Sequence, residues 1–352
     1  EIEHPPVECV FTTEEEVGLN GAKALDKSVL KARTMINMDS EDEGVATVSC
    51  AGGLRVQFTK EIQRTTVQGS LLTLKVEGLL GGHSGQDIDK ERQNADLLMA
   101  RMIQRLLKET KGQLVSFNGG TKDNAIPREC EASLIYESDE EAAKAEELAC
   151  ELAETYAEEL TPAEPDFSCE ISCETNRTAE AIPQDAAKEF ICAMRLAPNG
   201  IQKRNIKMDG FVVVSLNLGV VRTEEDRIVM IFSPRSSVAS LQEDTKERLN
   251  TLAETFGFTV SHSSEYPGWS FKEDSPVREI CKESYKELFG EDLKIEAIHA
   301  GLECGLFSDA IKGLDAIAIG PTIANCHTPD EYLTLDSFER FYEFLKDILS
   351  RL

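Results

Sequence analysis

The stretch FTTEEEVGL, residues 11–19, places three successive carboxylates and a glycine directly after a β-branched and aromatic run at residues 7–11. We expect that run to be a strand, because β-branched and aromatic residues favour strands. Ligands of α/β sheets bind outside the carboxyl ends of the strands. Adjacent carboxylates repel one another unless a cation or water offsets their charge. The stretch therefore predicts either a cation site at a strand end or a solvated acidic turn.

A second apolar run, residues 34–38, also ends on an acidic cluster, which begins with Asp39. The pattern at residues 21–25 predicts a short helix between the two runs. Two parallel strands joined by such a helix would bring Glu15, Glu16 and Asp39 to one edge of a sheet. This repetition favours the cation site over the acidic turn.

Length and composition limit the class of protein. A chain of 352 residues can form two domains of ordinary size, and its net charge of −27 disfavours nucleic acid and anionic membranes as partners. We expect no membrane span, because no apolar stretch approaches ~18 residues, and no signal peptide, because no basic segment is followed by an apolar one at the start of the sequence. The ten cysteines include no C-x-x-C pair, which argues against structural zinc. Their low share of so large a chain indicates a reducing cytoplasm and not a disulfide scaffold.

The two ends of the chain differ in pattern from its middle. Residues 1–52 and 266–352 alternate predicted helices and strands, whereas residues 53–265 combine hairpin-spaced strands with about four helices. We therefore predict an α/β fold in which residues 1–52 and 266–352 form one split domain. An α+β domain of residues 53–265 would be inserted into it.

Three of the five histidines, His83, His299 and His327, lie in glycine-containing loops. Two of them, His299 and His327, follow predicted strands in the same domain as the acidic residues above. One histidine with two or three carboxylates would suit Zn²⁺, Mn²⁺ or Co²⁺, with coordination positions left for water. A solvent-exposed loop residue is the alternative interpretation for each histidine.

Six motifs, in order along the whole chain, resemble those of the di-zinc metallopeptidases that include aminoacyl-histidine dipeptidases. They read TEEEVGLNGA, INMDSEDEG, GGHSGQDI, GGTKDNAIP, HAGLECG and CHTPDE, beginning at residues 13, 36, 81, 119, 299 and 326. The bacterial Xaa-His dipeptidases (peptidase D, carnosinase-like) are the most similar group. The resemblance implies a phosphorylase/hydrolase-like three-layer catalytic domain with an inserted lid or dimerisation domain. It also implies a cytoplasmic hydrolase of dipeptides, of Xaa-His type or broader, with a homodimer as an expectation.

The resemblance assigns the acidic residues and one histidine to a site for two zinc ions, with Mn²⁺ or Co²⁺ as alternatives. Glu15 would be the general base, which takes a proton from a metal-bound water and returns it to the leaving amine. Glu16 and His327 would bind one metal ion, and Asp39 would bind the other. A shift by one residue within the three glutamates, Glu14 to Glu16, is an open alternative.

The resemblance also implies four contacts with the substrate. His83 would stabilise the tetrahedral oxyanion, in several family members by reaching across a dimer. Arg235 would bind the C-terminal carboxylate of the substrate through its bidentate guanidinium. Asn124 and His299 would be secondary substrate contacts. The alternatives are a solvated loop for His83 and a surface arginine for Arg235.

One part of the family pattern is not found in this sequence. Family members carry an H-x-D segment and a later metal-bridging Asp upstream of the TEEE motif, and the ten residues before Phe11 contain neither. We therefore expect a missing N-terminal segment and weak or absent activity for the chain as given. Two alternatives stay open: a non-catalytic binding or assembly fragment, and an amidohydrolase acting on N-acyl amino acids.

Overall fold

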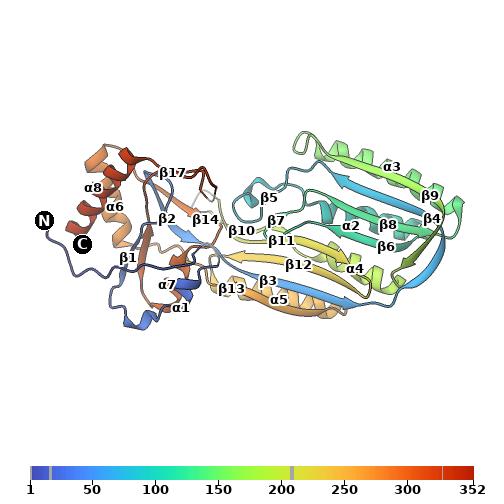
Figure 1. Cartoon of the computed structure of the whole chain (residues 1–352), viewed down its shortest axis with the longest axis horizontal. Helices are drawn as coiled ribbons and strands as arrows, with labels where there is room; N and C mark the ends of the chain where they lie inside the picture. The colour runs from blue at the N-terminus through green and yellow to red at the C-terminus, as the bar shows by residue number, and fades with distance from the viewer. Residues whose placement is uncertain (1, 16–17, 207–209, 327) are drawn as a thin grey trace. The chain divides into compact units, whose positions relative to one another are not determined.

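The computed structural model describes residues 2–15, 18–206, 210–326 and 328–352. The chain forms two compact units (Figure 1). The first unit consists of Glu1–Gly53, Ser236–Ala239 and Tyr266–Leu352, and the second of Leu54–Arg235 and Ser240–Glu265. The predicted mixed α/β class is confirmed. The labels of catalytic domain and of lid or dimerisation domain stay predictions.

The first unit is built on a four-stranded mixed sheet. Its strands, in spatial order, are β1 (Thr34–Asn37), β15 (Asp315–Ala318), β2 (Val45–Cys50) and β14 (Lys294–Ile298). β1 runs parallel to β15, and β14 runs parallel to β2. β15 and β2 are antiparallel and pair at Ala318 and Thr47.

Helices cover both faces of this sheet (Figure 1). They are α1 (Asn20–Ala24), α6 (Pro276–Phe289), α7 (Glu303–Ala310) and α8 (Leu335–Arg351). Ala316 and Ala318 of β15 share an apolar core with Phe307 of α7. Ile319 points to the opposite face, where Tyr285 of α6 stacks edge-on against Phe344 of α8 at 5.2 Å. Because successive strand residues face opposite sides, the unit has three layers, helices, sheet and helices.

The second unit contains a nine-stranded sheet. Its strand order is β13-β3-β12-β11-β6-β8-β4-β9, and β10 pairs with β11. The bounds are β3 (Gly52–Glu61), β4 (Thr65–Glu77), β6 (Gln113–Gly119), β8 (Cys130–Tyr136), β9 (Ser168–Ala181), β10 (Gly200–Asn205), β11 (Phe211–Thr223), β12 (Arg227–Ser236) and β13 (Thr259–Tyr266).

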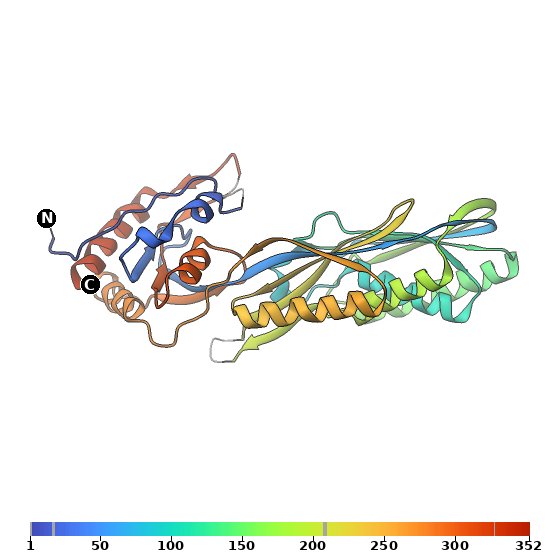
Figure 2. The same cartoon turned by 90° about the horizontal axis from the view of Figure 1, so that it is seen from below.

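Four helices pack on one side of this large sheet (Figure 2). They are α2 (Ala95–Glu109), α3 (Asp139–Leu160), α4 (Gln184–Leu196) and α5 (Ala239–Thr255). Alternate residues of β4, Leu72, Leu74 and Val76, are fully buried under them. The rings of Phe117 in β6 and Phe190 in α4 meet edge-on, with centroids 5.4 Å apart. Among the described residues, no helix is both long and apolar enough to cross a membrane.

The predicted strand at residues 7–11 is wrong. In the described part of the chain these residues belong to no strand, and Phe11 is 89% exposed. The Glu8 carboxylate instead accepts backbone N–H bonds from residues 31 and 32, at 3.0 and 2.9 Å. β-Branched residues form a strand only where a neighbouring strand offers a ladder of hydrogen bonds. Of the two predicted parallel strands, residues 34–37 form β1, whereas residues 7–11 form none, so the predicted pair does not exist.

Candidate active site

The acidic turn separates its first two glutamates into different environments. The Glu15 carbonyl accepts the N–H groups of Gly18 at 3.1 Å and Leu19 at 2.8 Å, which closes the turn ahead of α1. Glu15 is half-buried, whereas Glu14 is exposed and its carboxylate accepts a hydrogen bond from the Asn20 side chain at 3.1 Å. Of these two residues, Glu15 is the better candidate for proton transfer. Glu16 lies outside the described residues.

Asp39 follows the end of β1 and has an exposed side chain. Its backbone N–H donates to Asn37 Oδ1 at 3.0 Å, which fixes the turn out of the strand. The chain that leaves β15 runs beside this turn. A Cβ on Gly320 would lie 1.8 Å from the Ser40 carbonyl oxygen, so only glycine permits the approach. The ends of the parallel strands β1 and β15 therefore meet where α/β sheets hold their ligands.

The CHTPDE loop is held against the same turn. The N–H of Ile323, in the short strand β16 (Ile323–Ala324), donates to the Glu41 carbonyl at 2.9 Å. Partial desolvation and a hydrogen bond to the Glu41 carboxylate raise the pKa of the Cys326 thiol. His327 itself lies outside the described residues. The structure thus brings the INMDSEDEG and CHTPDE motifs together, through the neighbours of His327.

His299 follows β14 and is buried, with 6% of its surface exposed. The carbonyls on either side of it, of Ile298 and Ala300, both accept the N–H of Ala51, at 3.2 and 3.0 Å. This bifurcated bond ties the HAGLECG motif to the end of β2. Burial raises the pKa of the Cys304 thiol of this motif well above its usual value, so it stays protonated at neutral pH.

In the second unit, His83 and Asn124 lie on neighbouring segments. His83 ends the two-residue strand β5 (Gly82–His83), which pairs with β7 (Ala125–Ile126). The Ser84 N–H donates to the Asn124 carbonyl at 2.9 Å, and the Asn124 side chain is exposed. Gly82 has φ of +132°, a value that side chains other than glycine's rarely permit, so the turn into His83 requires glycine.

The environment of His83 favours its neutral imidazole. Nδ1 accepts hydrogen bonds from the backbone N–H groups of Gly85 at 3.3 Å and Gln86 at 3.0 Å. Burial and the positive charge of Arg235 lower the pKa of His83, and Asp87 opposes this only in part. The neutral ring with a lone pair on Nδ1 carries its proton on Nε2. His83 can therefore donate one hydrogen bond from Nε2.

Arg235, near the end of β12, is buried, with 6% of its surface exposed. The alternative interpretation as a surface arginine is therefore wrong. Its charge is close enough to His83 to lower the pKa of the imidazole. The second unit thus gathers a guanidinium, a neutral imidazole and the GGTKDNAIP segment, whereas Glu15, Asp39 and His299 belong to the first unit.

The family model of peptidase family M20/M25/M40 matches residues 2–351. The chain belongs to this family. It is 33% identical to the cytosol non-specific dipeptidase of Escherichia coli (strain K12), over 99% of this chain and 72% of that protein. It also matches the crystal structure of aminoacylhistidine dipeptidase from Vibrio alginolyticus with a TM-score of 0.95 and 34% identity. That match covers 100% of this chain and 72% of the other. The family resemblance is confirmed, and this M20 peptidase is a hydrolase of peptide bonds.

A buried amide network behind the His83 and Asn124 segments was not predicted from the sequence. Asn217 of β11 is buried, and its Nδ2 donates to the carbonyls of Ala125 at 2.8 Å and Asp123 at 3.3 Å. Asn94 caps α2 and donates from its own Nδ2 to the Leu218 carbonyl at 2.8 Å. The signal was an asparagine within the apolar run FVVVSLNLGVV at residues 211–221.

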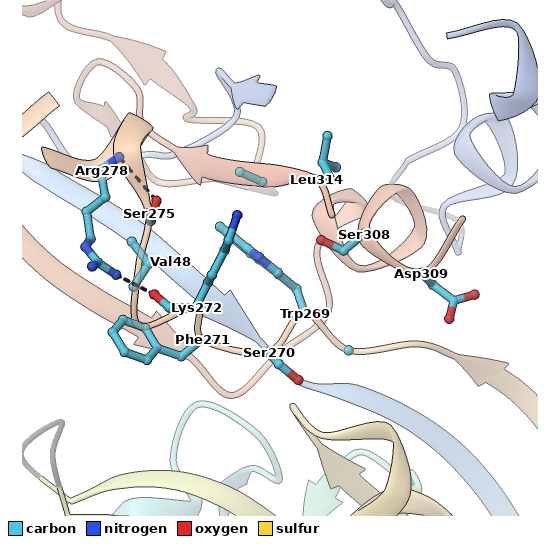
Figure 3. A pocket seen from close by; sticks show the side chains of 12 residues that line it. Val48, Trp269, Ser270, Phe271, Lys272, Ser275, Arg278, Ser308, Asp309 and Leu314 are labelled. Carbon is cyan, nitrogen blue, oxygen red and sulfur yellow. Dashed lines mark hydrogen bonds between the residues drawn. The ribbon is translucent and has the colours of Figure 1, made fainter. Parts of the chain in front are cut away.

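A pocket of about 390 Å³ in the first unit of this M20 peptidase does not contain the predicted residues (Figure 3). It is lined by Leu314 and Ala316 at the beginning of β15, together with Val48 and Trp269. Arg278, which also lines the pocket, donates a hydrogen bond from its guanidinium to the Lys272 carbonyl at 2.7 Å. The pocket thus lies at the amino end of β15, whereas Asp39 follows the carboxyl end of the parallel strand β1. We therefore do not assign the pocket to the active site.

The described residues supply only part of a metal-binding set. Among them, no group of three or more His, Cys, Asp and Glu side chains is placed to hold a metal ion. Two of the three predicted ligands, Glu16 and His327, are outside the described residues. Asp39 is described, and its motif meets the segment next to His327 through the Ile323 N–H and the Glu41 carbonyl.

Proposed function

We propose that this M20 peptidase is a cytoplasmic dipeptidase that cleaves Xaa-His and other dipeptides. The observation that carries the proposal is the buried Arg235 beside the neutral His83. A guanidinium binds a carboxylate with two parallel hydrogen bonds, and an imidazole Nε2–H can polarise a carbonyl oxygen. In a dipeptide, only one residue separates the scissile carbonyl from the terminal carboxylate. The names of the two relatives support the same substrate class and, for one of them, the cytosol.

We assign a role in hydrolysis to each of the five predicted site residues that are not metal ligands. Arg235 binds the substrate carboxylate, and Asn124 and His299 contact the rest of the dipeptide. His83 donates from Nε2 to the carbonyl oxygen as it gains negative charge. Glu15 takes a proton from the attacking water and delivers it to the leaving amine, which cannot depart as an anion.

We further propose that metal ions are required. Two carboxylates and one imidazole, from Glu16, Asp39 and His327, are the donor types that zinc accepts, and Mn²⁺ or Co²⁺ are alternatives. When bound, such an ion would lower the pKa of a water molecule and polarise the substrate carbonyl. The predicted pair of zinc ions is tested by metal analysis of the purified chain. The predicted homodimer is tested by light scattering.

A substrate series tests the role of the carboxylate. We expect a dipeptide to be cleaved about 100-fold better in kcat/KM than the same dipeptide with a C-terminal amide, because the amide loses a charge-assisted pair with Arg235. Arg235→Met should remove this preference. Equal rates for acid and amide would contradict the proposal, and preferred cleavage of N-acyl amino acids would favour the amidohydrolase.

A further inference from the structure

A buried glutamate outside the predicted site closes the loop that carries His83. Glu164 follows α3 and has 3% of its surface exposed. Its Oε2 accepts the N–H of Leu80 at 2.7 Å, and its Oε1 accepts the N–H of Gln93 at 2.8 Å. Leu80 and Gln93 are the two ends of the segment that contains His83. One carboxylate therefore joins both ends of that segment.

The segment between these ends is held by its own hydrogen bonds. The His83 N–H donates to Asp87 Oδ2 at 2.8 Å, and the Asp87 N–H donates back to the His83 carbonyl at 3.0 Å. Arg92 donates from its guanidinium to the Gly81 carbonyl at 2.6 Å. The segment is therefore a small folded unit, and the Glu164 carboxylate binds the backbone at both of its ends.

Glu164 is itself fixed in place. Its N–H donates to the Leu160 carbonyl in the last turn of α3 at 2.9 Å, and its carbonyl accepts the Phe167 N–H at 3.2 Å. A buried carboxylate is costly unless hydrogen bonds replace its hydration, and here each oxygen has one backbone donor. The cost is offset only while both ends of the His83 segment stay in position. Through these two hydrogen bonds, the position of the His83 segment depends on the position of the end of α3.

We propose that Glu164 is a positioning residue for His83, which holds the Nε2–H donor in the orientation needed for the carbonyl oxygen of the substrate. The proposal rests on the dipeptidase activity proposed above and assigns a role to a residue with no place in the six family motifs. Loosening the segment misplaces the donor without removing it. Small displacements of positioned groups lower rates by up to about 100-fold.

The first test is kinetic. Glu164→Gln keeps the side-chain size but turns an NH₂ group toward one of the two backbone donors, which breaks one of the two bonds. We expect kcat to fall about 10- to 100-fold with KM nearly unchanged. Glu159→Gln is the matched control, because Glu159 lies on α3 with an exposed side chain paired to Arg101. A fall in kcat for the control as large as for Glu164→Gln would overturn the proposal.

A double-mutant cycle separates positioning from general stability. If Glu164 acts through His83, Glu164→Gln should lower kcat only slightly further in a His83→Ala background. If the decrease in kcat of the double variant equals the product of the decreases in the two single variants, the proposal is overturned. Thermal unfolding of the same variants shows whether they are folded at the assay temperature, so that kcat is compared among folded proteins.

A measurement that does not depend on catalysis distinguishes failure of this proposal from failure of the proposed function. In ¹⁵N-histidine NMR, the ring signals of His83, assigned by their loss in His83→Ala, report its tautomer. We expect the Nε2–H tautomer in the wild type and broadened or averaged signals in Glu164→Gln. This change in a protein without dipeptidase activity would support the positioning role while rejecting the function. Unchanged signals would overturn the positioning role.

Discussion

The Nδ1 atom of His83 accepts the backbone N–H of Gln86 at 3.0 Å. A protonated imidazole would place a second N–H on Nδ1, opposite this donor and that of Gly85. The loop and the neutral ring therefore stabilise one another. Together with burial and the nearby Arg235 charge, which lower the pKa of His83, this keeps an uncharged Nε2–H donor in place at neutral pH.

Removing the positive charge beside His83 should raise the pKa of its imidazole. Arg235→Met deletes the guanidinium, and we expect the pKa of His83 to move toward its usual value of 6.5. The measurement is an NMR titration of the ring C–H signals. Arg248→Met, on the exposed side of α5, is the control and should leave the titration unchanged. An identical His83 titration in Arg235→Met would show that the two charges do not interact.

The two glutamates of the acidic turn should differ in their effect on the rate. Glu15→Gln is expected to lower kcat about 10²- to 10⁴-fold, because the amide cannot accept the proton of the attacking water. Glu14→Gln should have little effect, since Glu14 is exposed and bonds only a neighbouring asparagine in the described structure. Steady-state kinetics on a dipeptide measures both. Loss of activity in Glu14→Gln and retention in Glu15→Gln would instead support the shifted assignment.

Local signals explain which elements could be predicted from the sequence. The helix α6 begins at Pro276, directly after its N-cap Ser275, and ends before Gly290, which is in the left-handed conformation; both signals lie in the local sequence. The prediction of a strand at residues 7–11 was wrong because a strand needs pairing partners, which are distant in sequence. For the same reason local sequence does not set the length of β9, which continues to Ala181 because it pairs with β4 along its length.

Some residues of the candidate site could likewise be located from the sequence, whereas others were revealed only by the structure. Motifs located His83 and Asn124, and the structure adds that β5 and β7 place them side by side. The burial of Arg235 was not predictable, because its SPRSS surroundings look like those of a surface turn. Glu164 was missed because its partners are backbone groups 84 and 71 residues away, which no side-chain pattern records.

The buried Asn217 should matter more for stability than an ordinary polar residue. Asn217→Ala leaves the Ala125 and Asp123 carbonyls without the Nδ2 donor that they share. We expect the free energy of unfolding to fall by about 1–3 kcal/mol. Urea unfolding followed by circular dichroism is the suitable measurement, because the single tryptophan, Trp269, belongs to the other unit. A loss below about 0.5 kcal/mol, the usual range for surface changes, would contradict this role.

The buried carboxyl of Asp96, in the first turn of α2, should make the second unit less stable as pH rises. Burial raises the pKa of Asp96 to about 8, and the neighbouring Cys130 thiol and the charge of Arg222 offset this only in part. In the unfolded chain the pKa is about 3.9. The unfolded state therefore loses its proton at a lower pH than the folded state. The stabilisation from this group is complete below about pH 4 and is lost as the pH rises to about 8.

Asp96→Asn removes the ionisation but keeps the size of the side chain. Between pH 5 and pH 7 we expect its free energy of unfolding to rise relative to the wild type by about 1.4 kcal/mol per pH unit, the linkage value for one proton. Urea unfolding of both proteins at several pH values, followed by circular dichroism, gives the difference. Asp89→Asn, an exposed change nearby in sequence, should differ from the wild type by a constant amount. A difference for Asp96→Asn that is equally flat with pH would show that Asp96 is already ionised in the folded protein.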